Sequence, residues 1–142
     1  MMSGYLSNRE ATRATIDEDG WLHTGDLGRF DDDGYLYLGD RLKELIKVKG
    51  FQVAPAELEA VLRSHPAVAD AAVVRVPDAE TGERPKAFVV ARGELDHDDL
   101  RAFVNEQVAE YKRIDEIEEI DALPRSPTGK LLRRMLVAAP VA

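Results

Sequence analysis

The stretch from Pro55 to His65, PAELEAVLRSH, constrains the fold of this chain more than any other part of the sequence. Proline suits the first turn of a helix, because the N–H that it lacks would have no partner there. Leu58 and Leu62 recur at the spacing of one helical face. His65 precedes Pro66, and the residue before a proline resists the helical conformation. The stretch therefore predicts a short helix whose apolar face packs against another element.

Strand-like segments on both sides of this helix supply the surface that its apolar face requires. Residues 68–76 (VADAAVVRV) and 86–91 (KAFVVA) predict an antiparallel pair, because a turn containing Pro and Gly separates two valine-rich runs. Residues 41–53 predict a strand, a turn and a second strand, with Gly50 at the break.

The order of the elements from residue 41 onward gives the fold class. Asp96 can cap a second helix. The order ββ-α-β-β-α-β predicts an α+β domain, in which helices cover a small mixed sheet. The remaining predicted elements are a helix over 98–110, a strand over 114–120, a polar loop over 121–130 and a helix over 130–137. We expect this domain to span 41–137 and to be followed by a tail, 138–142.

Residues 1–40 have a different character. They predict a helix over 8–16 capped by Asn8, and short strands within 20–39 joined by a turn at Asp31–Gly34. They contain few residues that could build a core of their own. We therefore expect 1–40 to be the terminal fragment of a larger domain.

Composition excludes several classes of protein. The chain has 142 residues, 44% of them hydrophobic, so it can bury a core. It has no cysteine, which excludes disulfides and thiolate chemistry and suits a reducing, cytoplasmic location. No apolar run approaches the roughly 18 residues of a membrane span, and the start of the chain lacks the pattern of a secretory signal. The three histidines are isolated in the sequence, so we expect no metal site.

The distribution of charge points to a local anion site. The net charge is −8, which argues against a nucleic-acid-binding protein. Eight of the 19 basic residues nevertheless lie in two short windows, 41–49 and 125–134. One such window is commonly a solvated face, but two in an acidic chain favour binding of phosphate or carboxylate.

Two short motifs could carry such chemistry. The loop 124–130 (PRSPTGK) combines stiffening prolines with Gly129, and it ends in Lys130, which a loop of this kind can present to a phosphate as a point charge. It is not a Walker A loop, because the first glycine and the final Ser or Thr are absent. Asp26, in HTGD, could accept two hydrogen bonds from a ribose diol. Taken alone, each motif is equally compatible with an ordinary surface turn.

Read together, three segments resemble one family. They are GYLSNREATRATIDEDGWLHTGD, GYLYLGDRLKELIKVKGFQVAPAELE and PRSPTGKLLRR. In order and spacing they resemble the last third of adenylate-forming enzymes, the superfamily of acyl-CoA synthetases, luciferases and adenylation domains, and most of all 4-coumarate–CoA ligases. The resemblance implies ATP-dependent activation of a fatty or aryl acid as acyl-AMP, followed by attack of the CoA thiol. It also implies a small mobile lid that serves both half-reactions.

The resemblance assigns roles to residues at the nucleotide. Lys130 matches the catalytic lysine that contacts the α-phosphate and the acid carboxylate. Asp26 matches the acid that holds the ribose hydroxyls, and Arg41 an arginine that reaches the nucleotide. Asp40 and Lys43 match the hinge between the domains.

The basic window 41–49, with the residues just after it, matches the segment that faces the active site during thioester formation. In this sequence that segment carries Lys47, Lys49, Gly50 and Gln52, and the glycine lines the pantetheine tunnel of the family. The phosphate loop, the acid pocket and most of the Mg²⁺ site belong in the family to a large N-terminal domain. We therefore expect the isolated chain to be inactive without that partner. The alternative is a non-enzymatic module derived from such a lid that binds a nucleotide, CoA or a protein.

Overall fold

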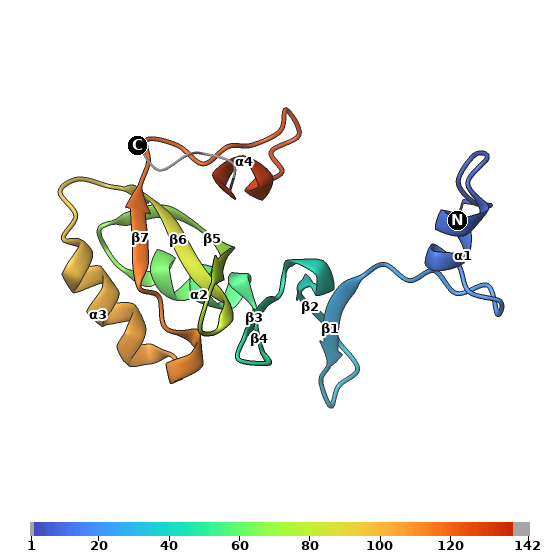
Figure 1. Cartoon of the computed structure of the whole chain (residues 1–142), viewed down its shortest axis with the longest axis horizontal. Coiled ribbons are helices and arrows are strands. Elements are labelled where there is room, and N and C mark those ends of the chain that lie inside the picture. Colours follow the sequence, from blue (N-terminus) through green and yellow to red (C-terminus); the bar gives the residue numbers. More distant parts are fainter. Residues whose placement is uncertain (1, 138–142) are drawn as a thin grey trace. The chain divides into compact units, whose positions relative to one another are not determined.

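The computed structural model describes residues 2–137 and divides into two compact units, Met1–Leu42 and Lys43–Ala142. Figure 1 shows the order of their elements. Each unit has its own local structure.

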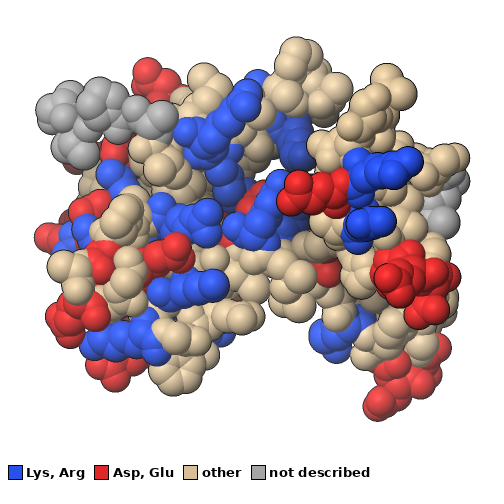
Figure 2. Space-filling model, turned by 45° about the vertical axis from the view of Figure 1, so that its right-hand side comes forward, with Lys and Arg blue, Asp and Glu red and all other residues tan. Residues whose placement is uncertain are grey.

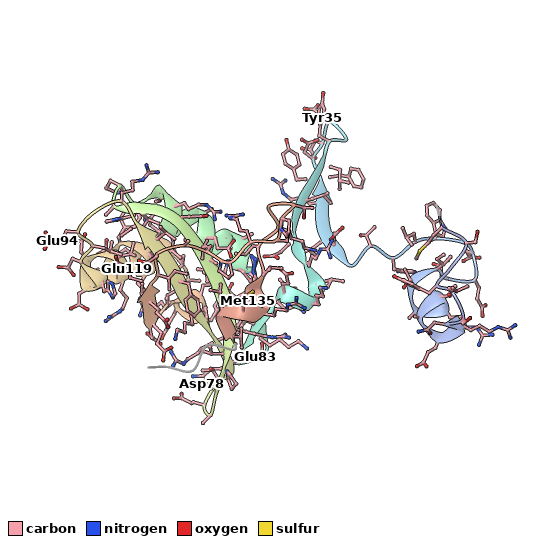
Figure 3. All side chains as sticks on the ribbon, turned by 90° about the horizontal axis from the view of Figure 1, so that it is seen from above. Tyr35, Asp78, Glu83, Glu94, Glu119 and Met135 are labelled. Carbon is pink, nitrogen blue, oxygen red and sulfur yellow. The ribbon has the colours of Figure 1, made fainter. Side chains whose placement is uncertain are left out.

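The first unit contains a short helix and a hairpin. Helix α1, Arg9–Thr15, begins at Asn8, whose side chain accepts a hydrogen bond from the Ala11 N–H. Strands β1, Asp26–Phe30, and β2, Leu36–Arg41, pair antiparallel as expected. The first strand begins only at Asp26, so most of the apolar stretch before it is not strand. Tyr35 stands at the tip of the hairpin, exposed to solvent (Figure 3).

The second unit is built on a five-stranded mixed sheet, which confirms the α+β fold class. Its strand order is β4-β3-β6-β5, and β7 also pairs with β6. The pairing of β6 with β7 is parallel, whereas the other pairings are antiparallel. The strands are β3 (Ile46–Val48), β4 (Phe51–Val53), β5 (Val68–Asp78), β6 (Gly82–Ala91) and β7 (Glu116–Glu119).

Two helices cover one face of this sheet. They are α2, Pro55–Ser64, and α3, His97–Gln107, which Asp96 caps through the N–H groups of Asp98 and Asp99. Their buried leucines and valine pack against one set of alternate strand residues. The resulting main cluster consists of Ile46, Val48, Val53, Leu58, Leu62, Val68, Ala71, Val73, Ala87, Val89, Leu100, Val104 and Ile114.

The C-terminal segment covers the opposite face of the sheet. Because side chains alternate along a strand, the residues between those of the main cluster point the other way. There Ala72, Val74 and Phe88 pack with Leu123 and Leu136 in a second, smaller cluster. Leu136 belongs to the terminal helix α4, Arg133–Val137, so this helix is held by apolar contact with the sheet.

Several predicted boundaries were wrong. The terminal helix was expected from residue 130, but it begins at Arg133, because the backbone of residues 125–131 forms a hairpin instead. The strand expected from residue 41 is split: Arg41 ends β2, a 3₁₀ turn follows at Leu42–Glu44, and β3 begins at Ile46. A second 3₁₀ turn, Glu110–Lys112, replaces the expected end of α3. The expected tail, 138–142, lies outside the described residues.

Candidate functional site

Lys130 lies on a tight hairpin of residues 124–132, called here the Lys130 hairpin. Its backbone closes through the Ser126 N–H donating to the Lys130 carbonyl at 2.8 Å and the Leu132 N–H donating to the Pro124 carbonyl at 2.8 Å. Gly129 has a φ of +82°, a conformation that side chains other than glycine rarely adopt. The Lys130 N–H donates to the Ser126 hydroxyl at 3.1 Å. The hairpin is therefore ordered by its own hydrogen bonds.

The Lys130 side chain is exposed. No hydrogen bond or ion pair is found for its amine within residues 2–137. An amine placed in this way can meet an anion from outside the unit, which is what a catalytic lysine requires. Had the amine been buried in the unit, the role expected for it would have been impossible.

Two arginines, one within the hairpin and one just after it, hold the hairpin to β5 and α2. Arg125 Nη2 lies 2.7 Å from Asp70 Oδ2 on β5, and Arg125 Nη1 donates to the Gly129 carbonyl at 3.0 Å. Arg133, the first residue of α4, has its Nη2 2.7 Å from Glu59 Oε1 on α2. Sequence reasoning did not single out these arginines.

Glu59 is the buried member of this arrangement, with 6% of its surface exposed. Its Oε1 also accepts a hydrogen bond from the Val73 N–H at 2.9 Å, so the carboxylate joins α2 to β5. The sequence alone assigned no role to Glu59. The available signal was the position of Glu59 next to Leu58 on the apolar face of the predicted helix. An acid on a buried face is rare unless it is paired, so this position indicates a paired cation.

Asp26 and Arg41 form one polar pair in the first unit. They are direct partners in the β1–β2 register, and Arg41 Nε lies 3.1 Å from Asp26 Oδ1. The Asp26 N–H donates to the Thr24 hydroxyl at 3.2 Å, and the Leu42 N–H donates to the Gly25 carbonyl at 2.9 Å. The structure thus brings together the two residues that were expected at the nucleotide, and the half-buried Asp26 carboxylate keeps one oxygen outside this ion pair.

Lys47, Lys49, Gly50 and Gln52 occupy the β3–β4 hairpin. Lys47 and Gln52 are register partners, and both are exposed. Lys49 and Gly50 form the two-residue turn with φ of +49° and +86°, the pattern of a type I′ turn. Lysine is an uncommon residue there, and it is held by its N–H donating to the Thr81 carbonyl at 2.9 Å and by Nζ lying 3.0 Å from Glu80 Oε1.

A groove of about 570 Å³ runs beside this turn. Phe51 and Tyr111 stack in it with ring centroids 4.6 Å apart, and Lys49 and Arg113 add positive charge to its lining. Asp78 lies at the same groove, where hydrogen bonds from Thr81 hold the pKa of its carboxyl below the ordinary value. Glu80, Glu110 and Asp115 also line the groove, which therefore offers flat apolar surface beside charges of both signs.

The residues expected at the hinge flank the boundary between the two compact units. Asp40 lies on β2, where its carboxylate accepts a hydrogen bond from the Arg41 N–H at 2.9 Å, and Lys43 lies in the first 3₁₀ turn. Their hinge role stays a prediction. Within the second unit, no hydrogen bond or ion pair of the described residues joins Lys130 to the β3–β4 turn. These two basic segments are thus separate features of the surface.

Other kinds of site find little support. On the face shown in Figure 2, Lys and Arg side chains lie among Asp and Glu side chains. No three His, Asp or Glu side chains of residues 2–137 gather in a way that could hold a metal ion. Among the helices of that same range, none combines the length and the apolar character that crossing a bilayer needs.

Comparison with known proteins links these features to one family. The model of the AMP-binding enzyme C-terminal domain family matches residues 57–130, just over half of the chain. 4-Coumarate–CoA ligase 5 of Oryza sativa subsp. japonica is 58% identical over 140 residues, which are 97% of this chain and 26% of the rice protein. The chain spans about a quarter to about half of the length of the curated relatives it matches.

Solved structures agree with this assignment. The o-succinylbenzoate CoA synthetase of Bacillus subtilis, in complex with its acyl-adenylate intermediate, matches with a TM-score of 0.88 and 39% identity, covering 99% of this chain and 29% of that chain. ATP-bound MatB from Rhodopseudomonas palustris matches with a TM-score of 0.89 and 33% identity, covering 94% of this chain and 27% of that chain. The residues matched by the family model include β5, β6 and β7 and end at Lys130. The chain therefore belongs to the C-terminal domain family of AMP-binding enzymes, whose relatives here are acid–CoA ligases.

Proposed function

We propose that this chain is the C-terminal portion of an ATP-dependent acid–CoA ligase and that Lys130 is its catalytic lysine. The observation that supports this most directly is the exposed Lys130 amine on a hairpin fixed to the sheet. The fatty or aryl acid pocket and most of the ATP site would lie in a large N-terminal domain. Alone, this chain would be inactive.

In the first half-reaction, the acid carboxylate attacks the α-phosphorus of ATP, acyl-AMP forms and pyrophosphate leaves. Negative charge gathers around the phosphorus as the bond forms. The Lys130 ammonium, brought there by movement of the lid, stabilises that charge. Removing one such positioned group typically costs about 10²–10³ in rate. Mg²⁺, held mainly outside this chain, would neutralise phosphate charge.

Asp26 and Arg41 would hold the nucleotide through its ribose. A carboxylate can accept hydrogen bonds from both hydroxyls of a vicinal diol. The Arg41 guanidinium, 3.1 Å from Asp26 Oδ1, would orient that carboxylate and supply further donors for the nucleotide. Asp40 and Lys43 would be the joint about which the second unit turns between half-reactions.

In the second half-reaction, the CoA thiol attacks the acyl carbon, the thioester forms and AMP leaves. The β3–β4 turn would face the active site in that pose. Gly50 lacks a Cβ, and open space lies above it, so that a pantetheine chain could pass close to the backbone. Lys47, Lys49 and Gln52 would contact CoA or the departing AMP, and the groove beside the turn could take further parts of CoA.

The proposal is tested in a chimera that joins the N-terminal portion of the rice ligase to this chain. The two sequences are 58% identical over the region exchanged. We expect ATP–pyrophosphate exchange with 4-coumarate, and about 10²–10³-fold slower exchange in Lys130→Ala. Lys112→Ala is the matched control, because Lys112 pairs with Glu57 away from the hairpin. Equal activity of the Lys130→Ala and Lys112→Ala chimeras would refute the role of Lys130.

The same preparations distinguish the alternative, a binding module without catalytic function. Such a module would bind AMP or CoA saturably in the isolated chain, while the chimera would form no acyl-AMP. Turnover by the isolated chain with ATP and any acid of a panel would instead refute the proposed need for a large domain.

A further inference from the structure

The structure assigns to Arg133 a positioning role: its ion pair with the buried Glu59 holds the Lys130 hairpin in the orientation that presents the amine. This inference rests on the proposed role of Lys130 and extends it to residues that contact no substrate. It concerns how contacts within the second unit hold the exposed Lys130 side chain in one orientation.

The first step of the argument is the burial of Glu59. Its side chain is 8% exposed, and Oε1 already accepts the Val73 N–H at 2.9 Å and lies 2.7 Å from Arg133 Nη2. Arg63 Nη1 lies farther away, 3.9 Å from Oε2. A buried carboxylate is costly unless a cation is paired with it. The attraction between Glu59 and Arg133 therefore holds the first residue of α4 against α2.

The second step connects Arg133 to Lys130. Two residues separate them in sequence, and one of these, Leu132, closes the hairpin by donating its N–H to the Pro124 carbonyl. Leu131 packs against the second hydrophobic cluster. Little rotational freedom remains between the guanidinium and the lysine backbone, so that displacement of Arg133 has to disturb the hairpin.

The third step is that the ion pair of Arg125 with Asp70 holds the hairpin more weakly than the ion pair of Arg133 with Glu59. The Arg125–Asp70 pair has side chains 47% and 32% exposed, whereas those of Arg133 and Glu59 are 22% and 8% exposed. Exposed ion pairs contribute little and are screened by salt. Arg133 also lies 3.6 Å, through Nε, from Glu44, directly after the expected hinge residue Lys43. The buried anchor is thus the one that ties the hairpin to the start of the second unit.

Arg134 provides a matched control. It is the neighbouring residue, of the same type and on the same helix, and none of the hydrogen bonds or ion pairs found within residues 2–137 involves its side chain. Arg133→Met and Arg134→Met both remove one positive charge and keep an unbranched apolar stem. A difference between them therefore reports the ion pairs of Arg133 with Glu59 and Glu44, and the Glu59→Gln variant below isolates the first of these.

Amide hydrogen exchange in the full chain measures the anchor without an activity assay. In Arg133→Met we expect Ser126, Gly129 and Leu132 to exchange about a hundredfold faster, because breaking a buried pair is strongly destabilising. The paired core strands should keep their protection, and Arg133→Lys should recover part of the loss. Equal exchange in the Arg133→Met and Arg134→Met variants would overturn the inference.

Glu59→Gln guards against a variant that merely unfolds. It keeps an acceptor for the Val73 N–H and removes the charge, so the hairpin amides should exchange faster while β5 and β6 stay protected. An unchanged hairpin, or equal loss throughout the second unit, would contradict a local anchor. The double variant Glu59→Gln/Arg133→Met should lose no more than Arg133→Met alone, because both changes remove the same interaction.

The chimera separates this inference from the proposed function. There Arg133→Met should lower kcat for pyrophosphate exchange about tenfold and leave the KM for ATP unchanged, since only the placement of the transition-state contact suffers. An unchanged kcat would overturn the positioning role. If Lys130→Ala has no effect while the hairpin amides still respond to Arg133→Met, the proposed function fails but the anchor stands.

Discussion

Truncation of Leu136 to alanine tests whether the two faces of the sheet carry separate clusters. Leu136 is 7% exposed and packs on the smaller cluster beneath the C-terminal segment. Buried leucine-to-alanine changes cost about 2–5 kcal/mol, and we expect about 2 kcal/mol here, because the cluster is small and lies at the edge of the domain. Since about 1.4 kcal/mol corresponds to a factor of ten, local opening should increase about 30-fold.

Hydrogen exchange and urea unfolding together give the readout. In Leu136→Ala the amides of Ser126 and Leu132 should exchange about 30-fold faster, with the urea midpoint of the main cluster nearly unchanged. Met135→Ala is the control on the same helix, because Met135 is 55% exposed. Leu62→Ala, fully buried in the main cluster, should instead lower the free energy of unfolding of the whole unit by about 3 kcal/mol. A Leu136→Ala variant that loses as much global stability as Leu62→Ala would show one cooperative core and refute the reasoning.

Three further changes probe single interactions. Asp96→Ala should lower the free energy of unfolding by about 1 kcal/mol, because two N–H groups of α3 lose their cap. Urea unfolding measures this loss, and Asp96→Asn should keep most of the original stability. Gly50→Ala should cost about 1–2 kcal/mol from its φ of +86° alone, since no atom lies within 4 Å of the added Cβ, and a neutral result would contradict that backbone geometry. The Arg84 guanidinium, with help from Lys86, holds the pKa of Glu116 below its ordinary value of 4.5. The ionised Glu116 therefore stabilises the fold above pH 4.5, and this stabilisation is lost as the pH falls through the lower folded-state pKa. In Glu116→Gln the urea midpoint should therefore depend less on pH in that acidic range, and an unchanged pH profile would refute the pairing.

Much of the second unit follows from local patterns in the sequence. The periodicity of α2, the Asp96 cap and the alternation in β5 and β6 each specify an element without help from distant residues. The lengths of β5 and β6 could not be predicted from these local patterns. Pro77 and Pro85 suggested a long turn, yet both lie within strands. They are tolerated because β5 is an edge strand and Pro85 lies between the parts of β6 that pair with β3 and with β7.

The candidate site was predictable only in part. Lys130 and Asp26 stand in recognisable motifs, and both are placed where a ligand could reach them. The supports of the Lys130 hairpin depend on pairs far apart in the chain, Arg133 with Glu59 and Arg125 with Asp70. No local pattern announces such pairs, because each residue alone is typical of a solvent-exposed helix or turn. They emerge only when the sheet brings their elements together.

The position of the second cluster has a consequence for synthesis on the ribosome. The main cluster can assemble once residue 114 has emerged, because its last member is Ile114. At that stage Ala72, Val74 and Phe88 still form a bare apolar strip on the reverse side of the sheet. That strip waits for Leu123 and then Leu136 before it is shielded. A nascent chain stalled between residues 114 and 136 would hold an assembled main cluster while the reverse side of the sheet exposed an apolar strip. Exposed apolar surface of this kind favours aggregation and is what chaperones recognise.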